Sequence, residues 1–132
     1  MNGFKVFIAC LMLAFPANAQ QDQVRVVIES QIEALLADDF ETAFTFAAPN
    51  IKQMFGTSAY FGMMVAKGYP MVHRPADFLF KDMRPDTDGV VQNVLIRDVQ
   101  GDYYIAEYSL IETENGWKIS GVTVLQAPGV GA

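Results

Sequence analysis

The spacing of apolar residues changes once along the chain, near Gly68, and this change limits the folds that the chain can adopt. Before Gly68, apolar side chains recur at every third or fourth residue, which is the spacing of a helix that buries one face. After it, apolar and polar residues alternate in short runs between turn sequences, which is typical of strands. Helices followed by consecutive strands indicate an α+β domain in which N-terminal helices pack on one antiparallel sheet.

The first part of the domain predicts three helices. An apolar stripe at helical spacing marks the first helix over residues 22–37. Asp38-Asp39 is expected to break this helix and to cap a second one, which ends at Pro49. Thr57 can cap a third helix over residues 58–67. Because this third helix is apolar on nearly all sides, we expect it to be buried.

Two prolines after Gly68 predict an extended segment. In Tyr69-Pro70 and Arg74-Pro75, the residue before each proline is biased toward extended backbone. Alternate residues of an extended segment point to the same side. Tyr69, Met71 and His73 are therefore predicted to share one face.

Strands follow this segment, and the last two are joined by the strongest turn signal in the chain. Strands are predicted over residues 90–99, 103–113 and 117–125, after an extended run near residues 78–81. Asn115-Gly116 predicts a two-residue hairpin turn with positive φ at both residues. The register built on this turn pairs Tyr108 with Thr123 and Leu110 with Gly121.

That register leaves a second apolar row on the outer face of the sheet. Its members are Ile105, Ile111, Val122 and Val124. Four such side chains removed from water could contribute about 6–12 kcal/mol per subunit before the costs of association. We therefore predict a homodimer formed through the sheet face.

The first nineteen residues have the features of a cleaved export signal. Lys5 precedes the apolar stretch of residues 6–15, and Ala17-Asn18-Ala19 fits the small-x-small pattern that signal peptidase accepts. Ten residues rise about 15 Å as a helix, which is half of a hydrocarbon core, so this segment should not span a membrane. We expect cleavage after Ala19, a periplasmic or secreted location, and loss of Cys10, the single cysteine.

Cleavage would leave one domain over residues 20–126 and a loose tail over residues 127–132. The composition of the chain limits the chemistry of that domain. The 9 Lys and Arg against 15 Asp and Glu give a net charge of −6, which argues against nucleic-acid binding. A single histidine and a mature chain without cysteine argue against a zinc site and a Ser-His-Asp triad. We expect no metal and no cofactor.

Several short motifs together resemble a family of exported bacterial proteins called domain of unknown function 4864. They are residues 43–49, Phe55-Gly56, residues 64–70, His73-Arg74-Pro75 and residues 116–121. That family is similar to the nuclear-transport-factor-2-like superfamily, in which helices pack on a curved antiparallel sheet to form a cone. The resemblance therefore implies a cone-like α+β fold and leaves the activity open, because that fold hosts enzymes, ligand binders and association modules.

A pocket in such a fold could bind a ligand or carry out acid–base chemistry. We predict a non-catalytic domain that binds a small apolar or amphipathic ligand, or a protein partner. The candidate binding residues are Tyr60, Met64, Tyr69, Met71, His73, Arg74 and Tyr108. The alternative is a small isomerase or lyase with His73 or Asp77 as the acid–base group. Each candidate also has a purely structural interpretation: the tyrosines as core rings, and Arg74 as the partner of an acidic residue.

Overall fold

The computed structural model describes residues 17–127. Most of the predicted export signal, including Cys10, lies outside the described residues, and so does the tail after Ala127. Among the helices within residues 17–127, none is both long enough and apolar enough to cross a membrane.

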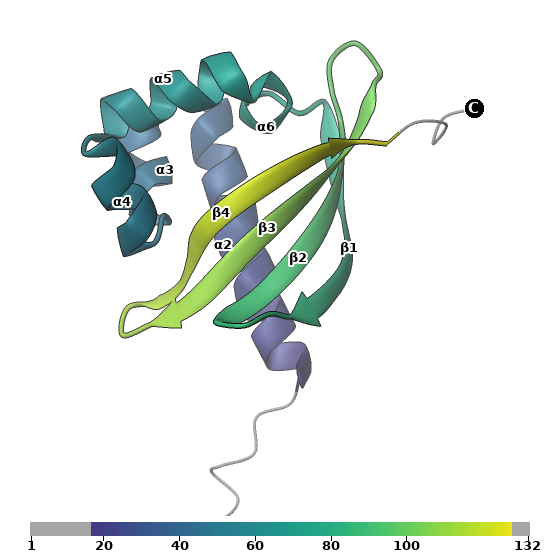
Figure 1. The fold of residues 1–132 in the computed structure, drawn as a ribbon. Coiled ribbons are helices and arrows are strands. Elements are labelled where there is room, and N and C mark those ends of the chain that lie inside the picture. Colours follow the sequence, from purple (N-terminus) through teal and green to yellow (C-terminus); the bar gives the residue numbers. More distant parts are fainter. Residues whose placement is uncertain (1–16, 128–132) are drawn as a thin grey trace, which may run out of the picture.

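Five helices form the N-terminal part of the described chain. They are α2 (Ala17–Leu36), α3 (Phe40–Thr45), α4 (Pro49–Phe55), α5 (Ser58–Gly68) and α6 (Pro70–His73). The predicted caps are confirmed: the Asp39 side chain accepts a hydrogen bond from Thr42 N, and the Thr57 side chain accepts one from Tyr60 N. The long helix α2 lies behind the sheet, and α3, α4 and α5 lie beside it (Figure 1).

Four strands form one antiparallel sheet in the order β1-β2-β3-β4. They are β1 (Asp77–Pro85), β2 (Gly89–Arg97), β3 (Tyr103–Thr113) and β4 (Gly116–Gln126). The α+β class is therefore confirmed, but the sheet is neither closed nor strongly curled, and no cone is formed (Figure 1). The 20 residues of α2 span about 30 Å along one face of the sheet, so a helix, and not the curling of the sheet, closes the core.

The core lies between α2 and the sheet. Helix α2 contributes Val24, Ile28, Ile32 and Leu35 at helical spacing, and each is at most 1% exposed. The sheet contributes one residue in two along β2 and β3, as expected for strands with one buried face. These residues are Val90, Val94, Ile96, Ala106, Tyr108 and Leu110.

The segment after Gly68 differs from the prediction, because it forms the short helix α6 and is not extended. Pro70 occupies the first turn of α6, where its missing N–H and fixed φ cost nothing. The N–H of His73 donates to Tyr69 O at 3.0 Å, and the N–H of Arg74 donates to Pro70 O at 2.9 Å. The prediction that Tyr69, Met71 and His73 share one strand face is therefore wrong.

The hairpin between β3 and β4 also differs from the prediction. Gly116 has φ of 96°, but Asn115 does not have positive φ, since Asp38 is the only such non-glycine residue within residues 17–127. Thr113 pairs with Gly116, so the two-residue loop consists of Glu114 and Asn115. The predicted turn at Asn115-Gly116 is therefore wrong. A bulge near Ser109 shifts the register again, so Tyr108 pairs with Val122 and not with Thr123.

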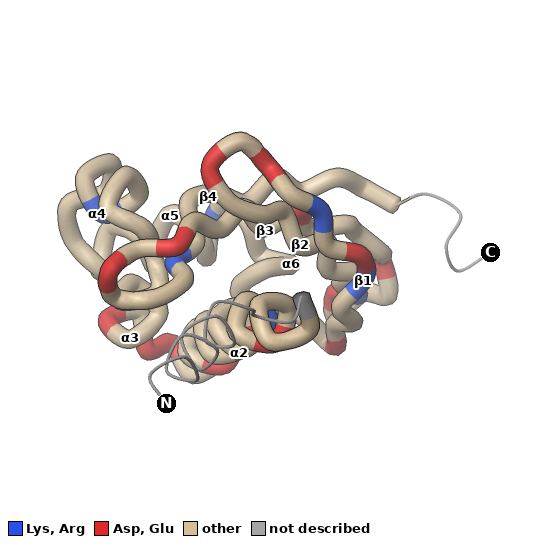
Figure 2. Tube along the Cα trace, turned by 90° about the horizontal axis from the view of Figure 1, so that it is seen from below, with Lys and Arg blue, Asp and Glu red and all other residues tan. Residues whose placement is uncertain are grey.

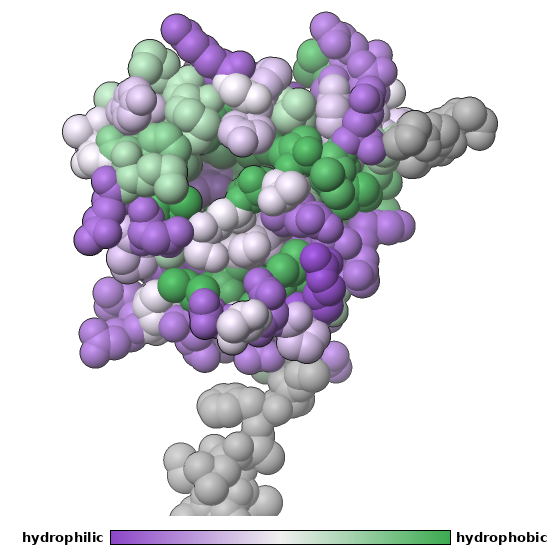
Figure 3. All heavy atoms as spheres, in the orientation of Figure 1, coloured by the Kyte–Doolittle hydropathy of each residue, from purple (hydrophilic) through white to green (hydrophobic). Residues whose placement is uncertain are grey.

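This register moves Val122 and Val124 to the core face, where they pack against the buried cluster. The predicted outer row is therefore wrong in two of its four members. A different aliphatic row crosses the outer face, one residue from each strand: Leu79, Leu95, Ile105 and Leu125. Hydrophobic side chains gather near the end of the sheet where β4 finishes (Figure 3). Dimerisation through this face stays a prediction.

Candidate functional site

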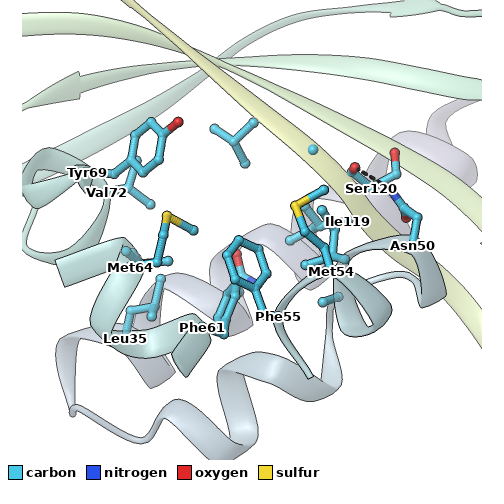
Figure 4. Close-up of a pocket in the computed structure, with 16 residues that line it drawn as sticks. Leu35, Asn50, Met54, Phe55, Phe61, Met64, Tyr69, Val72, Ile119 and Ser120 are labelled. Carbon is cyan, nitrogen blue, oxygen red and sulfur yellow. Dashed lines mark hydrogen bonds between the residues drawn. The ribbon is translucent and has the colours of Figure 1, made fainter. Parts of the chain in front are cut away.

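A cavity of about 340 Å³ lies between the outer edge of β4 and the helices beside it. Figure 3 shows the hollow between these helices and the sheet, and Figure 4 shows the side chains around it. The lining residues come from α2, α4, α5, the segment around α6 and the middle of β4. They are Gln31, Leu35, Ala47, Asn50, Ile51, Met54, Phe55, Phe61, Met64, Val65, Tyr69, Val72, Ile119, Ser120, Gly121 and Val122.

The lining is apolar, with polar groups at a few points. Asn50 donates from Nδ2 to the carbonyl of Ser120 at 3.1 Å, which ties α4 to β4 at one end of the cavity (Figure 4). Gln31, only 4% exposed, donates from Nε2 to Ala43 O at 3.2 Å. At the opposite end, the hydroxyl of Tyr69 points toward β4 (Figure 4). None of the described residues that line the cavity is Asp, Glu, His, Lys, Arg or Cys.

A short strand-like contact sets the width of the cavity. Ala47 forms a parallel bridge with Ile119 of β4. The N–H of Ala48 donates to Ile119 O, and the N–H of Ile119 donates to Phe46 O, both at 2.8 Å. Pro49 then begins α4, and the N–H groups of Ile51 and Lys52 donate to Ala48 O, so the backbone turns into the helix and this pairing stops. The helices therefore leave the edge of β4 just where the cavity begins.

Aromatic contacts hold the helical wall of the cavity together. The ring of Phe61 lies 5.2 Å from that of Phe44 and 5.8 Å from that of Phe55, measured between ring centres. These separations are in the range that favours aromatic pairs. Gly62 of α5 lies against the ring of Phe40, so a side chain at this position would displace that ring. The helical wall is thus formed by residues of α4 and α5, and α3 packs against it.

Charged side chains lie mainly away from the cavity. Asp and Glu gather on α2, α3 and the turns between strands, as the charge-coloured trace shows (Figure 2). Lys118 lies on the part of β4 near the hairpin, and its ammonium group donates to Thr45 O at 3.1 Å. The cavity is therefore an apolar site within an acidic domain.

A comparison with protein families matches residues 17–132 to the family described as Domain of unknown function (DUF4864). The match covers all the helices and strands of the described chain. The chain belongs to the DUF4864 family. No curated protein and no solved structure matches it. The resemblance seen in the sequence motifs is thus confirmed at the level of the family, and the family description assigns no function.

Two of the predicted binding residues of this DUF4864 domain, Met64 and Tyr69, line the cavity. Tyr60 is 52% exposed, and its ring lies 5.8 Å from that of Phe55, outside the lining. Met71 packs at the margin of the core and does not line the cavity. Tyr108 is fully buried in the core, where its hydroxyl has no hydrogen-bond partner among residues 17–127 and burial raises its pKa.

The remaining predicted residues take part in ion pairs away from the cavity. His73 Nε2 lies 2.7 Å from Oδ1 of Asp38, and Arg74 donates to Oδ2 of the same carboxylate at 2.7 Å. Arg74 also donates to the carbonyl oxygen of Leu36, which is the last residue of α2. The contacts of Arg74 and His73 therefore hold α6 against the end of α2. Asp77 accepts a hydrogen bond from Arg97 at 2.7 Å. Neither His73 nor Asp77 lines the cavity.

Asp38 is expected to make stability depend on pH at the acid end. The hydrogen bond from His73 and the charge of Arg74 lower the pKa of Asp38 below its ordinary value of 3.8. A lowered pKa gives stability that is present above the ordinary pKa and is lost as the pH falls through the lowered one. The melting temperature of Asp38→Asn should therefore lie below that of the native protein at about pH 6 and approach it at about pH 2.

Asp88→Asn is the matched control for this measurement, because the Asp88 side chain has no ion pair or hydrogen bond within residues 17–127. The melting temperature of this variant should equal that of the native protein at both pH values. A constant gap between Asp38→Asn and the native protein over this pH range would contradict the role of the carboxylate charge.

The lining residues that the sequence did not identify lie on several elements that are distant in the chain. Asn50, Met54 and Phe55 lie on the short helix α4, and Gln31 lies on the buried side of α2. Met54 is 67% exposed, which is unusual for a large apolar side chain and is consistent with its place at the mouth of the cavity. The sequence does not show that Met54 is exposed, so this residue is identified as part of the cavity only from the structure.

Proposed function

We propose that this DUF4864 domain is an exported, non-catalytic binding domain whose cavity takes an apolar or amphipathic ligand. The observation that carries this proposal is the composition of the lining. A cavity of about 340 Å³ falls in the size range of ligand sites, and such sites are apolar with a few polar groups that fix orientation. Asn50, Gln31 and Tyr69 are groups of that kind.

Acid–base catalysis would need a titratable group in contact with the reacting molecule. Among the described residues that line the cavity, Tyr69 has the only titratable side chain. The alternative isomerase or lyase depends on His73 or Asp77, and these side chains are held by Asp38 and Arg97 away from the cavity. The binding function therefore has the stronger support.

Export is supported by the leader-like sequence of Met1–Ala19, and periplasmic or secreted location is part of the proposal.

A relation to the nuclear-transport-factor-2-like superfamily is a finer prediction, which rests on the sequence motifs alone. The open four-stranded sheet gives it no support, so the proposed binding site is argued from the cavity and not from that superfamily.

The proposal predicts that a fatty-acid probe stabilises the protein and that filling the cavity removes this effect. Dodecanoate at about 100 times its dissociation constant would add about 2.7 kcal/mol to the free energy of unfolding, which raises the melting temperature by several degrees. Met64→Trp places a larger side chain in the cavity and should abolish the rise. The measurement is thermal unfolding with and without dodecanoate.

Met63→Trp is the matched control. Met63 precedes Met64 on α5, but it is 45% exposed and does not line the cavity. This variant should keep the full ligand-induced rise. An equal loss in the two variants, or no rise in the native protein, would contradict an apolar ligand in this cavity.

A further inference from the structure

The two edges of the sheet differ in their protection against strand pairing. The edge strand β1 carries Lys81, Arg84 and Pro85, and it has an irregularity between Phe80 and Met83. Charges, proline and bulges are the features that prevent an edge strand from pairing with another chain. On the opposite edge, residues 121–126 of β4 are Gly-Val-Thr-Val-Leu-Gln, without charge or proline. The β4 edge is therefore open to a further strand.

The register shows which backbone groups of β4 are free. The N–H of Ala127 donates to Tyr103 O at 3.0 Å, so these two residues form a hydrogen-bonded pair at the end of the ladder. Such pairs alternate along an antiparallel ladder, and Thr123 therefore also directs its N–H and C=O toward β3. Val122 and Val124 consequently direct theirs away from β3, toward the open edge.

Part of this edge is already paired in the manner of a strand. The parallel bridge between Ala47 and Ile119 uses both backbone groups of Ile119. Within residues 17–127, this pairing ends where Pro49 begins α4. The next outward-facing groups, on Val122 and Val124, thus continue a line of strand pairing that the helices interrupt.

The cavity lies beside the start of this stretch of edge, at Val122. Gly121 and Val122 belong to its lining, and Met64 and Tyr69 lie across from them (Figure 4). The Val122 side chain lies on the core face of the sheet, because it pairs with the buried Tyr108. In a strand added at the β4 edge, alternate side chains would point to this face, and the one opposite Val122 would enter the cavity.

We propose that β4 pairs with an extended polypeptide segment, whose apolar side chain opposite Val122 enters the cavity. This inference rests on the proposed function, since it names the class of ligand that the cavity would take. The open edge favours a polypeptide over a lipid, because only a peptide backbone offers donors and acceptors at the spacing of Val122 and Val124. The edge from residue 122 to residue 126 has room for about five residues of a partner strand.

The test uses a capped seven-residue peptide of alternating valine and threonine with lysine at both ends. Two further versions carry N-methyl groups on complementary sets of alternate amides, so that in one version the methyl groups replace the donors that face β4. We expect the peptide to bind, one N-methylated version to bind at least about tenfold more weakly, and the other to keep its affinity. Equal affinity of all three would overturn the strand pairing, and so would a failure of the unmodified peptide to bind.

Amide hydrogen exchange locates the bound peptide on the protein. The amides of Val122 and Val124 should exchange quickly in the free protein and slowly with the peptide, whereas that of Thr123 should be slow in both states. Slow exchange at Val122 and Val124 without peptide would overturn the proposal, because a second copy or another segment of this chain would then occupy the edge. If dodecanoate binds and no peptide does, the proposed function stands and the strand pairing fails. If neither binds, both fail.

Discussion

Replacing Gly89 with alanine is expected to lower the free energy of unfolding by about 3 kcal/mol. Gly89 begins β2 and pairs with Ile111 of β3. A Cβ at this position would collide with the carbonyl oxygen of Leu110 and lie 3.1 Å from the Cα of Ile111. These are backbone atoms of a central strand, so the collision is relieved only by breaking the β2–β3 pairing. Denaturant unfolding measures the loss.

Gly121→Ala is the matched control for Gly89→Ala. Gly121 also lies in the sheet, but a Cβ there would meet no atom within 4 Å. Its effect on the free energy of unfolding should stay within about 0.5 kcal/mol. Similar stability of the two variants would contradict the close approach of β2 and β3 at Gly89, and with it the register between those strands.

Replacing Gln92 with leucine should cost more than about 2 kcal/mol of stability, although leucine has a similar size and is apolar. Gln92 is fully buried, and its amide nitrogen donates to the carbonyls of Lys81, Asp82 and Asn93. Its amide oxygen accepts from Nε of Arg25 at 3.3 Å. Leucine would remove all four of these hydrogen bonds at the irregular point of β1, although Lys81 O would keep the bond that it accepts from Nη2 of Arg25 at 3.0 Å. Thermal or denaturant unfolding reports the loss.

Asn93→Leu separates this network from a general effect of replacing an amide. The Asn93 side chain lies on the outer face of the sheet, and its hydrogen bonds with Asp82 and Arg84 are 3.3 and 3.4 Å long. Bonds of this kind, near solvent, contribute little to stability. We expect this variant to lower the free energy of unfolding by less than about 0.5 kcal/mol. A loss as large as that of Gln92→Leu would argue against the role given to the buried amide.

Features with a local cause could be predicted from the sequence. The end of α2 near Asp38, the caps at Asp39 and Thr57, and the strand of Tyr103–Thr113 all follow from side chains within a few residues. The α+β class follows from the order of helical and alternating patterns. These signals do not depend on which segments meet in the folded chain, and the structure confirms them.

The predictions that the structure contradicts concern segments whose conformation depends on contacts between residues distant in the chain. Pro70 is compatible both with an extended segment and with the first turn of a helix. The hydrogen bond between Asp38 and His73 and the ion pair between Asp38 and Arg74 fix the helix α6. The β3–β4 register depends on a bulge near Ser109, which has no signature in the sequence. A shift by one residue moves side chains to the other face, which explains why Val122 was assigned to the outer row.

The candidate site could be predicted only in part for the same reason. The apolar helix α5 pointed to Met64, and Met64 lines the cavity. The other wall is formed by α4 and the middle of β4, whose proximity depends on the bridge between Ala47 and Ile119. Tyr108 is a candidate in the sequence because of its phenol, but its side chain is fully buried in the core and does not line the cavity.

NMR of methionine methyl groups would show directly whether the cavity beside β4 binds an apolar group. The protein labelled at these methyl groups would be titrated with dodecanoate. Met54 and Met64 line the cavity, so their signals should shift together and saturate, while those of Met63 and Met83, which lie outside it, should stay in place. Unchanged signals from Met54 and Met64 at saturating dodecanoate, or equal shifts of all four methyl groups, would contradict binding of an apolar group in this cavity.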